Sequence, residues 1–281
     1  MSLSGITAYL RPATLEEAFS LLGERAIAVA GGTDVIRHPH AGVTTLVDLG
    51  ALPLRYIRAD RGFAVGANAT LTDMLEHPGL AVHLGGVLAG MLRGVGSPLL
   101  RNAATIGGHL ARGRYSDIVP VLIALDATVT LFDGTERTLP LADYYRGGLH
   151  RGPALITEVG IPPASADTAA AFLKFTRTIF DFALLNCAVR VRLGPSGTVT
   201  ESRVVVGETP GLGGLVAPAA DYLLEGPLDD EHIATAAAIA AQVIPAQDDQ
   251  RASAEYRRAL CRVGVRRCLD DVRRRLTEGR T

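Results

Sequence analysis

The chain has 281 residues, of which 48% are hydrophobic and 20% are charged, and its formal net charge at pH 7 is -1. This composition is typical of a globular protein with an ample core, arranged as one large domain or as two to three smaller ones. The near-neutral charge excludes a basic field that would attract nucleic acid or an anionic membrane, and no apolar run approaches the ~20 residues that span a bilayer.

The first predicted elements form a small βαβ-like unit, expected to be parallel. Thr14 can cap a helix, with Glu17 as its capping-box partner. Residues 26–30 read as a strand that enters a glycine loop, residues 33–36 can start a short helix, and residues 45–49 read as a second strand.

The next stretch combines hairpins with helices. Residues 56–59 and 63–67 flank a turn and predict a hairpin, after which Thr72 is expected to cap a helix through Leu75. Further elements are expected, in chain order, at 85–95 (helix), 117–125 (helix), 128–132 (strand, followed by an Asp133-Gly134 turn) and 155–159 (strand).

Residues 162–168, which begin with Pro162-Pro163, look like a linker. Beyond it we expect strands at 171–175, 186–193 and 202–207, then helices at 234–243 and 254–274. Arg262, Arg266 and Arg267 lie along the last helix, and such a charged face is typical of a solvated helix surface.

Two short glycine loops are the most informative feature. The first, Ala30-Gly31-Gly32-Thr33-Asp34, follows the first strand, and the second is Thr105-Ile106-Gly107-Gly108. Paired glycines let the backbone turn with positive φ and approach a ligand closely, and successive amides in such a turn suit phosphate oxygens. One Gly-Gly pair is weak evidence because most are only turns. Two of them predict two clamps on one diphosphate.

Lys174 is the only lysine in the sequence, against 28 lysines and arginines in total. Lysine and arginine replace one another on surfaces but not at specific sites. The single ammonium is therefore either a chance survivor or a group with a specific role.

Three cysteines, Cys187, Cys261 and Cys268, form no CxxC pattern. They cannot hold an iron–sulfur cluster alone, because such clusters need about four cysteine ligands. We expect buried free thiols and, since the N-terminus also lacks a signal-peptide pattern, a cytoplasmic protein. His38-Pro39-His40 could hold a metal only with a third ligand, so no metal site is expected.

The order and spacing of several segments are similar to one known family. They are Ala30–Asp34, Leu46–Leu49, Ser97-Pro98, Arg101–Gly108, Asp117–Pro120, Leu122–Ala127, Leu155–Val159, Lys174 with Arg177, Asp181, Phe182 and Ala183, and Ser253–Arg258. Together they resemble, nearly end to end, the FAD-binding medium subunit of molybdenum hydroxylases of the carbon monoxide dehydrogenase and xanthine dehydrogenase type.

The resemblance implies an α+β fold with an FAD cofactor. A two-part N-terminal FAD-binding domain would span 1–163, with a small α/β subdomain at about 1–55 and a mixed or antiparallel sheet subdomain at 56–163. A smaller C-terminal domain of antiparallel sheet and helices would span 169–281, and the FAD would extend between the two domains.

The resemblance also implies which residues contact FAD. Both glycine loops would hold the pyrophosphate through backbone amides, and Asp117 would bind the ribose or adenine side. Ile106 would pack on the isoalloxazine ring, Leu155 or Ile156 would touch the cofactor, and Lys174 would lie near the flavin or its ribityl chain. The complete expected set is Ala30, Gly31, Gly32, Thr33, Asp34, Thr105, Ile106, Gly107, Gly108, His109, Ser116, Asp117, Leu155, Ile156 and Lys174.

The implied function is electron transfer by an FAD-dependent oxidoreductase subunit. A molybdopterin large subunit would oxidise the substrate, and electrons would pass through an iron–sulfur small subunit to this FAD and on to an acceptor such as NAD or a quinone. The alternatives are a stand-alone FAD-dependent oxidoreductase acting on a small molecule, and a subunit that has lost its flavin.

The chain departs from the family pattern after Gly108. His109 stands where the family usually has asparagine, the following segment is one residue shorter, and it carries Arg112 and Arg114. His109 could donate a hydrogen bond to phosphate or flavin, and either arginine could neutralise the diphosphate. The alternative is a rearranged surface loop without a ligand contact.

Overall fold

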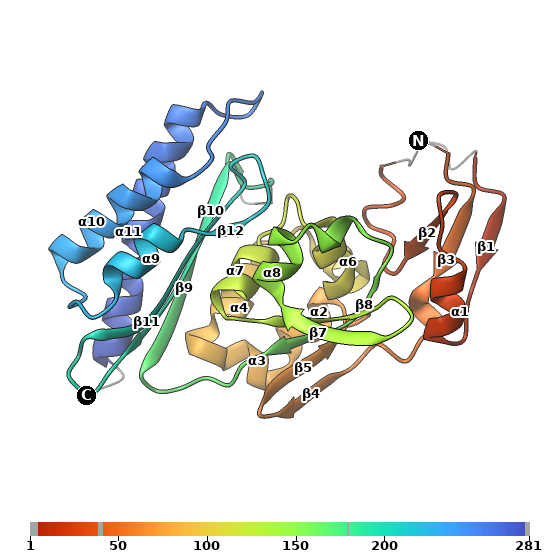
Figure 1. Ribbon diagram of the computed structural model, residues 1–281, viewed down its shortest axis with the longest axis horizontal. Helices are drawn as coiled ribbons and strands as arrows, with labels where there is room; N and C mark the ends of the chain where they lie inside the picture. The colour runs from red at the N-terminus through yellow and green to blue at the C-terminus, as the bar shows by residue number, and fades with distance from the viewer. Residues whose placement is uncertain (1–4, 39–41, 179, 279–281) are drawn as a thin grey trace. The chain divides into compact units, whose positions relative to one another are not determined.

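The structure, a computed structural model, describes residues 5–38, 42–178 and 180–278 and has the expected α+β composition (Figure 1). Two compact units interleave along the chain. The first comprises Met1–His77, Gly96–Arg112 and Ala127–Ile161, and the second comprises Pro78–Val95, Gly113–Asp126 and Pro162–Thr281. The domains expected from the sequence are consecutive segments, and their boundaries stay a prediction.

The first unit begins with a three-stranded parallel sheet in the order β1-β3-β2. Its strands are β1 (Ala8–Leu10), β2 (Ala26–Val29) and β3 (Thr45–Asp48). Helix α1 (Leu15–Ser20) starts at Thr14, whose Oγ1 accepts a hydrogen bond from the Glu17 amide at 3.1 Å. The expected parallel unit is confirmed, and β1 is a strand that the sequence pattern missed.

The rest of the first unit is built on a five-stranded antiparallel sheet in the order β4-β5-β8-β6-β7. Its strands are β4 (Ile57–Asp60), β5 (Gly62–Gly66), β6 (Thr128–Phe132), β7 (Glu136–Pro140) and β8 (Leu155–Ile161). Both expected hairpins, β4-β5 and β6-β7, are present.

Short helices accompany this sheet. They are α2 (Leu71–Glu76), α5 (Pro98–Ala103), α6 (Ile106–Arg112) and α8 (Leu141–Arg146), with 3-10 turns η1 (Leu49–Ala51) and η3 (Leu149–Arg151). The expected cap at Thr72 is wrong. Thr70 caps α2, because its Oγ1 accepts from the Asp73 amide at 3.0 Å while the Asp73 carboxylate accepts from the Thr70 amide at 2.9 Å.

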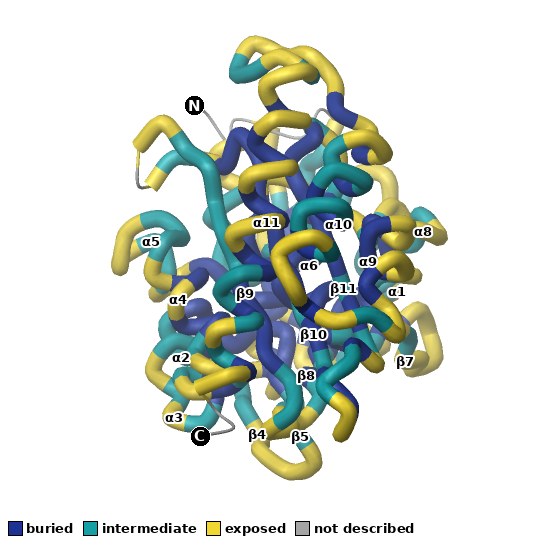
Figure 2. The backbone as a smooth tube through the Cα atoms, turned by 90° about the vertical axis from the view of Figure 1, so that its left-hand side faces the viewer, coloured by how far each residue is buried: buried dark blue, intermediate teal, exposed yellow. Residues whose placement is uncertain are grey.

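The second unit contains a four-stranded antiparallel sheet in the order β12-β11-β10-β9. Its strands are β9 (Thr168–Phe175), β10 (Leu185–Leu193), β11 (Val199–Gly207) and β12 (Gly214–Leu215). Helices α9 (Ala217–Leu223), α10 (Asp230–Val243) and α11 (Ala254–Glu278) pack on the sheet and on one another, and together they enclose an apolar core (Figures 1 and 2).

A second group of helices in this unit comes from earlier in the chain. They are α3 (Pro78–Val82), η2 (His83–Gly86), α4 (Val87–Arg93) and α7 (Ile118–Ala124). Every residue of α7 is buried, and α7 contacts both β10 and β11. A helix that is apolar on all sides is stable only when it is covered on all sides. This packing explains why segments before residue 127 belong to the second unit.

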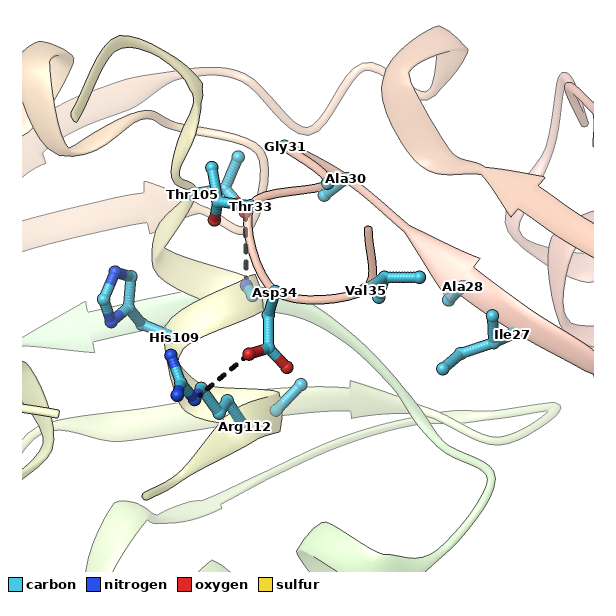
Figure 3. A pocket seen from close by; sticks show the side chains of 13 residues that line it. Ile27, Ala28, Ala30, Gly31, Thr33, Asp34, Val35, Thr105, His109 and Arg112 are labelled. Carbon is cyan, nitrogen blue, oxygen red and sulfur yellow. Dashed lines mark hydrogen bonds and ion pairs between the residues drawn. The ribbon is translucent and has the colours of Figure 1, made fainter. Parts of the chain in front are cut away.

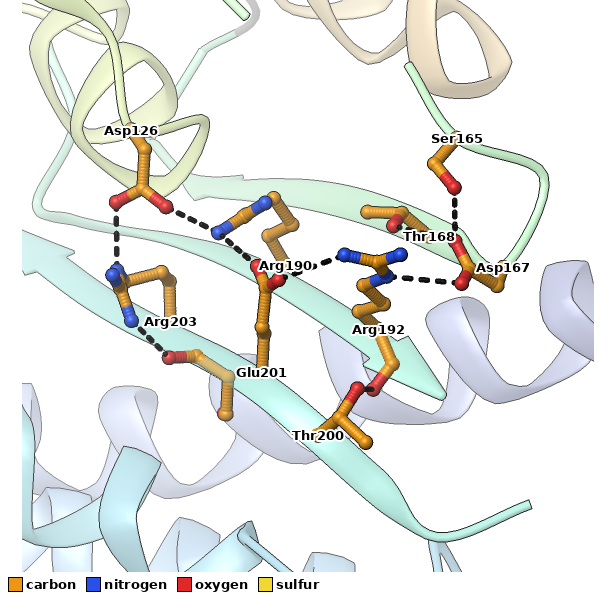
Figure 4. Close-up of polar contacts among 10 residues, drawn as sticks. Asp126, Ser165, Asp167, Thr168, Arg190, Arg192, Thr200, Glu201 and Arg203 are labelled. Carbon is orange, nitrogen blue, oxygen red and sulfur yellow. Dashed lines mark hydrogen bonds and ion pairs between the residues drawn. The ribbon is translucent and has the colours of Figure 1, made fainter. Parts of the chain in front are cut away.

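A network of ion pairs lies along β10 and β11 (Figure 4). Its members are Asp126, Asp167, Arg190, Arg192, Glu201 and Arg203. Arg190 contacts both Asp126 and Glu201, and Arg192 bridges Glu201 at 3.0 Å and Asp167 at 2.9 Å. Three guanidinium groups balance three carboxylates, so the network carries no net charge to attract a charged partner.

Cys187, Cys261 and Cys268 are free and buried, as expected from the sequence. Burial raises the pKa of the Cys268 thiol to about 12, with a further contribution from the Asp271 carboxylate. A hydrogen bond involving Cys261, together with burial, raises the pKa of the Cys187 thiol. These thiols are therefore core residues rather than reactive groups.

None of the helices in the described ranges is long and apolar enough to cross a membrane. The His38-Pro39-His40 pair cannot be judged as a pair, because Pro39 and His40 lie outside the described residues. His38 Nδ1 lies 2.9 Å from Asp34 Oδ1. Within residues 5–38, 42–178 and 180–278, no group of three or more histidine, cysteine or acidic side chains is arranged to hold a metal ion.

Candidate functional site: a pocket formed by two glycine segments

The first glycine loop leaves β2 and turns back in a single helical turn instead of the short helix expected at 33–36. Gly32 has a φ of +67°, and the Ile36 amide donates to the Gly32 carbonyl at 3.1 Å. The amides of Gly31, Gly32, Thr33 and Asp34 donate to no acceptor in the described part of the chain. A run of unpaired amides around a left-handed glycine is the arrangement that binds anions.

The second glycine segment is not a loop, because it forms the start of helix α6. The Ile106 and Gly107 amides donate to the carbonyls of Ala69 at 3.0 Å and Ala67 at 2.9 Å. The Gly108 amide donates to Thr105 Oγ1 at 3.2 Å, and the His109 amide donates to the Thr105 carbonyl at 3.1 Å. Both glycine amides are therefore already engaged with protein oxygens, and the expectation that they hold a diphosphate stays a prediction.

Both segments need glycine because backbones meet there. A Cβ on Gly31 would lie 1.7 Å from the Ala103 carbonyl oxygen, and a Cβ on Gly107 would lie 2.8 Å from the Ala67 Cβ. Neither distance leaves room for a side chain. Gly31 thus allows the first loop to pack directly against the segment that leads into α6, and Gly107 allows α6 to pack against Ala67.

The two segments line one cavity of about 250 Å³ within the first unit (Figure 3). Residues 30–35 form one wall, and Thr105, Gly108, His109 and Arg112 contribute to the other. The site expected from the sequence requires the two glycine segments to meet, and both of them line this pocket.

The ionised side chains of the pocket wall form a pair. Arg112 Nε lies 3.3 Å from Asp34 Oδ1, and the two side chains point toward each other in Figure 3. The same Asp34 oxygen accepts from His38 Nδ1. Arg112 lines the pocket, whereas Arg114 belongs to the second unit, is exposed, and donates to the Pro210 carbonyl at 3.4 Å.

His109 is uncharged in this setting. Burial lowers the pKa of its imidazole to about 4, and the positive charge of Arg112 adds to the effect while Asp34 opposes it. Its Nδ1 is buried and has no hydrogen-bond partner in the described structure. His109 therefore brings no positive charge to the pocket at neutral pH.

Three of the expected contacts are not supported by side-chain exposure. Ile106 is completely buried, and its packing on an isoalloxazine ring stays a prediction. Leu155 and Ile156 are also buried, and they pair with Phe132 and Leu131 of β6. Their side chains act in the core of the first unit, and any cofactor contact from this part of β8 would have to come from its backbone.

Ser116, Asp117 and Lys174 come together in the second unit. Lys174 Nζ lies 2.7 Å from Asp117 Oδ2 and donates to the Gly94 carbonyl at 3.3 Å. Asn186 Nδ2 donates to Asp117 Oδ1 at 2.9 Å, so the Asp117 carboxylate is held on both oxygens. The single lysine thus has a specific partner, and its contact with the cofactor stays a prediction.

Two members of this cluster were missed by sequence reasoning. Asn186 is fully buried inside the apolar strand β10, and Glu208 is buried just after β11, where its Oε1 accepts from the Ser116 amide at 3.2 Å. The signal available in the sequence was a polar residue within or at the end of an apolar strand. Such residues are costly to bury unless they are hydrogen-bonded, and they therefore often mark a polar cluster.

The Glu208 carboxyl group predicts a measurable pH dependence. Burial raises its pKa from 4.5 to about 7, and the Asp117 carboxylate adds to the shift, while the Ser116 and Tyr115 amides and Arg251 oppose it. Between pH 4.5 and 7 the folded protein keeps a proton that the unfolded chain has released. The free energy of unfolding therefore falls as pH rises through this window, by about 3 kcal/mol in total.

Glu208→Gln should remove this contribution, because glutamine keeps the shape and an acceptor oxygen but does not ionise. The difference in unfolding free energy between variant and parent, measured by urea denaturation from pH 4.5 to 8, should grow with pH in favour of the variant. Taking the difference cancels the contributions of other groups. A constant difference for Glu208→Gln across this pH range would contradict the prediction.

Comparisons with known proteins agree with this geometry. The family described as "FAD binding domain in molybdopterin dehydrogenase" matches residues 4–164, and the "CO dehydrogenase flavoprotein C-terminal domain" matches residues 170–272. The 6-hydroxypseudooxynicotine dehydrogenase complex subunit alpha of Paenarthrobacter nicotinovorans is 30% identical over 281 residues, covering 93% of this chain and 92% of that one.

Carbon monoxide dehydrogenase supplies both a relative and a similar structure. Its medium chain from Hydrogenophaga pseudoflava is 29% identical, covering 93% of this chain and 95% of that one. A solved structure of the enzyme from the same organism, in a form that lacks the Mo-pyranopterin moiety, matches with a TM-score of 0.88 at 27% identity. That match covers 96% of this chain and 98% of the other.

The fold, the pocket and these matches define an oxidoreductase subunit that binds FAD. The chain belongs to the family of FAD-binding medium subunits of molybdopterin dehydrogenases, the family that includes the carbon monoxide dehydrogenase medium chain. The expected family, cofactor and enzyme class are thereby confirmed.

Proposed function

We propose that this chain is the electron-transfer subunit of a multi-subunit molybdenum hydroxylase. Its FAD would receive electrons from iron–sulfur clusters on a small partner chain, after a molybdopterin-containing large chain has oxidised the substrate, and would pass them to an external acceptor such as NAD or a quinone. FAD supplies the redox chemistry when bound, and the protein supplies binding, orientation and electrostatics.

The observation that carries this proposal is the donor set of the first loop. Four consecutive amides, from Gly31 to Asp34, have no acceptor in the described structure and line a cavity opposite helix α6. They fit the oxygens of a dinucleotide diphosphate, because backbone amides in such a turn stabilise negative charge. We assign Ala30, Gly31, Gly32, Thr33, Asp34, Thr105, Gly108 and His109 to this part of the FAD site.

Asp117 and Lys174 are proposed as further FAD contacts. Their side chains are 9% and 14% exposed, and the Lys174–Asp117 pair is fixed by Asn186 and by the Gly94 carbonyl. A carboxylate held in this way is pre-organised to accept from a hydroxyl group. We include Ser116 in this set because its carbonyl accepts from Asn186 at 3.3 Å.

The cysteine content supports clusters on a partner chain. The three cysteines of the sequence are all buried in the core of the second unit, and a cluster needs about four thiolate ligands. Free thiols also support a reducing compartment, so we propose that the protein acts in the cytoplasm.

The test begins with the purified full chain. FAD should bind with a stoichiometry of one per chain, followed by visible absorbance and by the change in flavin fluorescence. Co-purification with an iron–sulfur chain and a molybdopterin-containing chain should then give a complex whose flavin is bleached by the substrate of the large chain. A colourless chain that takes up no added FAD would refute the proposal. Flavin reduction by a small molecule without any partner chain would favour a stand-alone enzyme instead.

A further inference from the structure

We propose that Arg112 is a diphosphate-binding residue, supplying from a side chain the contact that the α6 amides cannot make. This inference rests on the proposed FAD site and assigns a role to a residue that sets this chain apart from its family pattern. The chemical class of the ligand is a diphosphate ester.

The first step is the loss of one expected donor set. The amides of Ile106, Gly107, Gly108 and His109 all donate to protein oxygens, so α6 presents no free N–H at its first turn. A diphosphate in the pocket would therefore be held by main-chain donors on one side only, from Gly31 to Asp34.

The second step is the charge of the pocket wall. Its ionisable side chains are Asp34, His109 and Arg112, and the His109 imidazole is neutral. The wall therefore carries one negative and one positive charge, whereas a diphosphate diester carries about two negative charges. Without Arg112, the Asp34 carboxylate would repel the ligand, and no other described residue of the wall carries a positive charge to offset it.

The third step is the position of the guanidinium. Arg112 lies three residues after His109, so both side chains lie on the same face of α6, and both line the pocket that faces the free amides. Its side chain is 21% exposed, and its Nε is directed to Asp34. A guanidinium carries five N–H donors in a planar fork that matches phosphate oxygens, so contact with Asp34 and with a phosphate is compatible.

The other possibility is that Arg112 only neutralises Asp34. A double-mutant cycle separates the two roles, because a purely neutralising arginine is not needed once Asp34 is also uncharged. The dissociation constant of FAD should be measured by flavin fluorescence for the parent chain, Arg112→Gln, Asp34→Asn and the double variant.

We expect Arg112→Gln to weaken FAD binding by about 10- to 100-fold, the range of a charge-assisted hydrogen bond. The FAD affinity of the double variant should stay within a few-fold of the affinity of Arg112→Gln. Arg112→Lys should recover part of the loss, since it keeps the charge without the fork. Raising the salt concentration should weaken FAD binding by the parent more than by Arg112→Gln.

The matched control is Arg114→Gln, which removes an exposed arginine two residues further on that does not line the pocket. It should leave the FAD affinity within about two-fold, and circular dichroism should show that all variants are folded. An Arg112→Gln chain with parental affinity, or a double variant that regains it, would overturn the inference while leaving the proposed function intact. A parent chain that binds no FAD would instead overturn both.

Discussion

Replacing Gly31 by alanine is expected to abolish FAD binding. The new Cβ would lie 1.7 Å from the Ala103 carbonyl oxygen and 2.6 Å from its carbon, and both are backbone atoms that cannot rotate away. The first loop must therefore separate from the segment before α6, which disperses the four amides from Gly31 to Asp34. Since each hydrogen bond to a charged group contributes about 1.5–3 kcal/mol, we expect an affinity loss of at least about 100-fold.

The measurement is the FAD content of the purified variant and its dissociation constant for added FAD. The matched control is Gly23→Ala, in the same unit, because no atom lies within 4 Å of its new Cβ and its φ is not positive. That variant should bind FAD normally and unfold at the parental urea concentration. A Gly31→Ala chain with the parental FAD content would show that the contact between the two segments is not needed for the pocket.

The first glycine loop could be predicted from the sequence because its signals are local. An apolar strand followed by paired glycines predicts a sharp turn. The helix cap at Thr14 and the hairpin turn at Asp133-Gly134 were also predicted from a few adjacent residues. The structure adds that the amides of the glycine loop have no acceptor in the described part of the chain. Local chemistry therefore predicted the half of the pocket that carries the proposed function.

The second glycine segment was misjudged because the partners of its amides are distant in sequence. The carbonyls of Ala67 and Ala69 accept from Gly107 and Ile106, and nothing near residue 106 predicts their approach. Thr105 before an apolar residue was a helix-start signal, but two glycines weigh against a helix. The helix forms because tertiary hydrogen bonds outweigh this low propensity.

The polar cluster of the second unit shows the same limit. The sequence singled out Lys174 by its rarity, but it could not pair Lys174 with Asp117 or bring Glu208 to the Ser116 amide, since these contacts depend on how α7 packs on β10 and β11. The interleaving of the two units has the same origin. Burial of α7 on all sides is a property of the packed structure, not of its own residues.

The last helix illustrates how one residue type takes two roles. Arg262, Arg266 and Arg267 are exposed, as their spacing predicted. Arg257 is only 1% exposed, and its guanidinium donates to three carbonyls and one carboxylate: Leu184 at 3.2 Å, Gln247 at 2.6 Å, Ala252 at 2.8 Å and Asp249 Oδ1 at 2.8 Å. Helical spacing places Arg257 on the same face as Leu260, Cys261 and Gly264, a signal of burial that sequence reasoning missed.

Replacing Arg257 by methionine is expected to destabilise the second unit by about 3–5 kcal/mol, the usual cost of removing one partner from a buried ion pair. Methionine fills a similar length but removes a donor from three carbonyls, of which that of Ala252 keeps another donor, the Asp249 amide at 3.1 Å. Asp249 is also affected. Although burial opposes its ionisation, hydrogen bonds from Arg257 and from the Arg251 and Ala252 amides hold the pKa of the Asp249 carboxyl below its usual value. Loss of Arg257 should raise that pKa.

Hydrogen–deuterium exchange of peptides from β10 and α11 measures this effect where it arises, because exchange of core amides reports the free energy of opening. Arg258→Met is the matched control, since it makes the same change one position further along the same helix at an exposed side chain, and it should alter stability by less than about 0.5 kcal/mol. Arg257→Lys should fall between the two, because an ammonium keeps the charge but cannot reach all four acceptors in one plane. Equal exchange rates of these peptides in Arg257→Met and Arg258→Met would contradict the prediction. The guanidinium would then not be what joins the segment before β10 to the start of α11, and apolar packing of the helix alone would have to account for the stability of the unit.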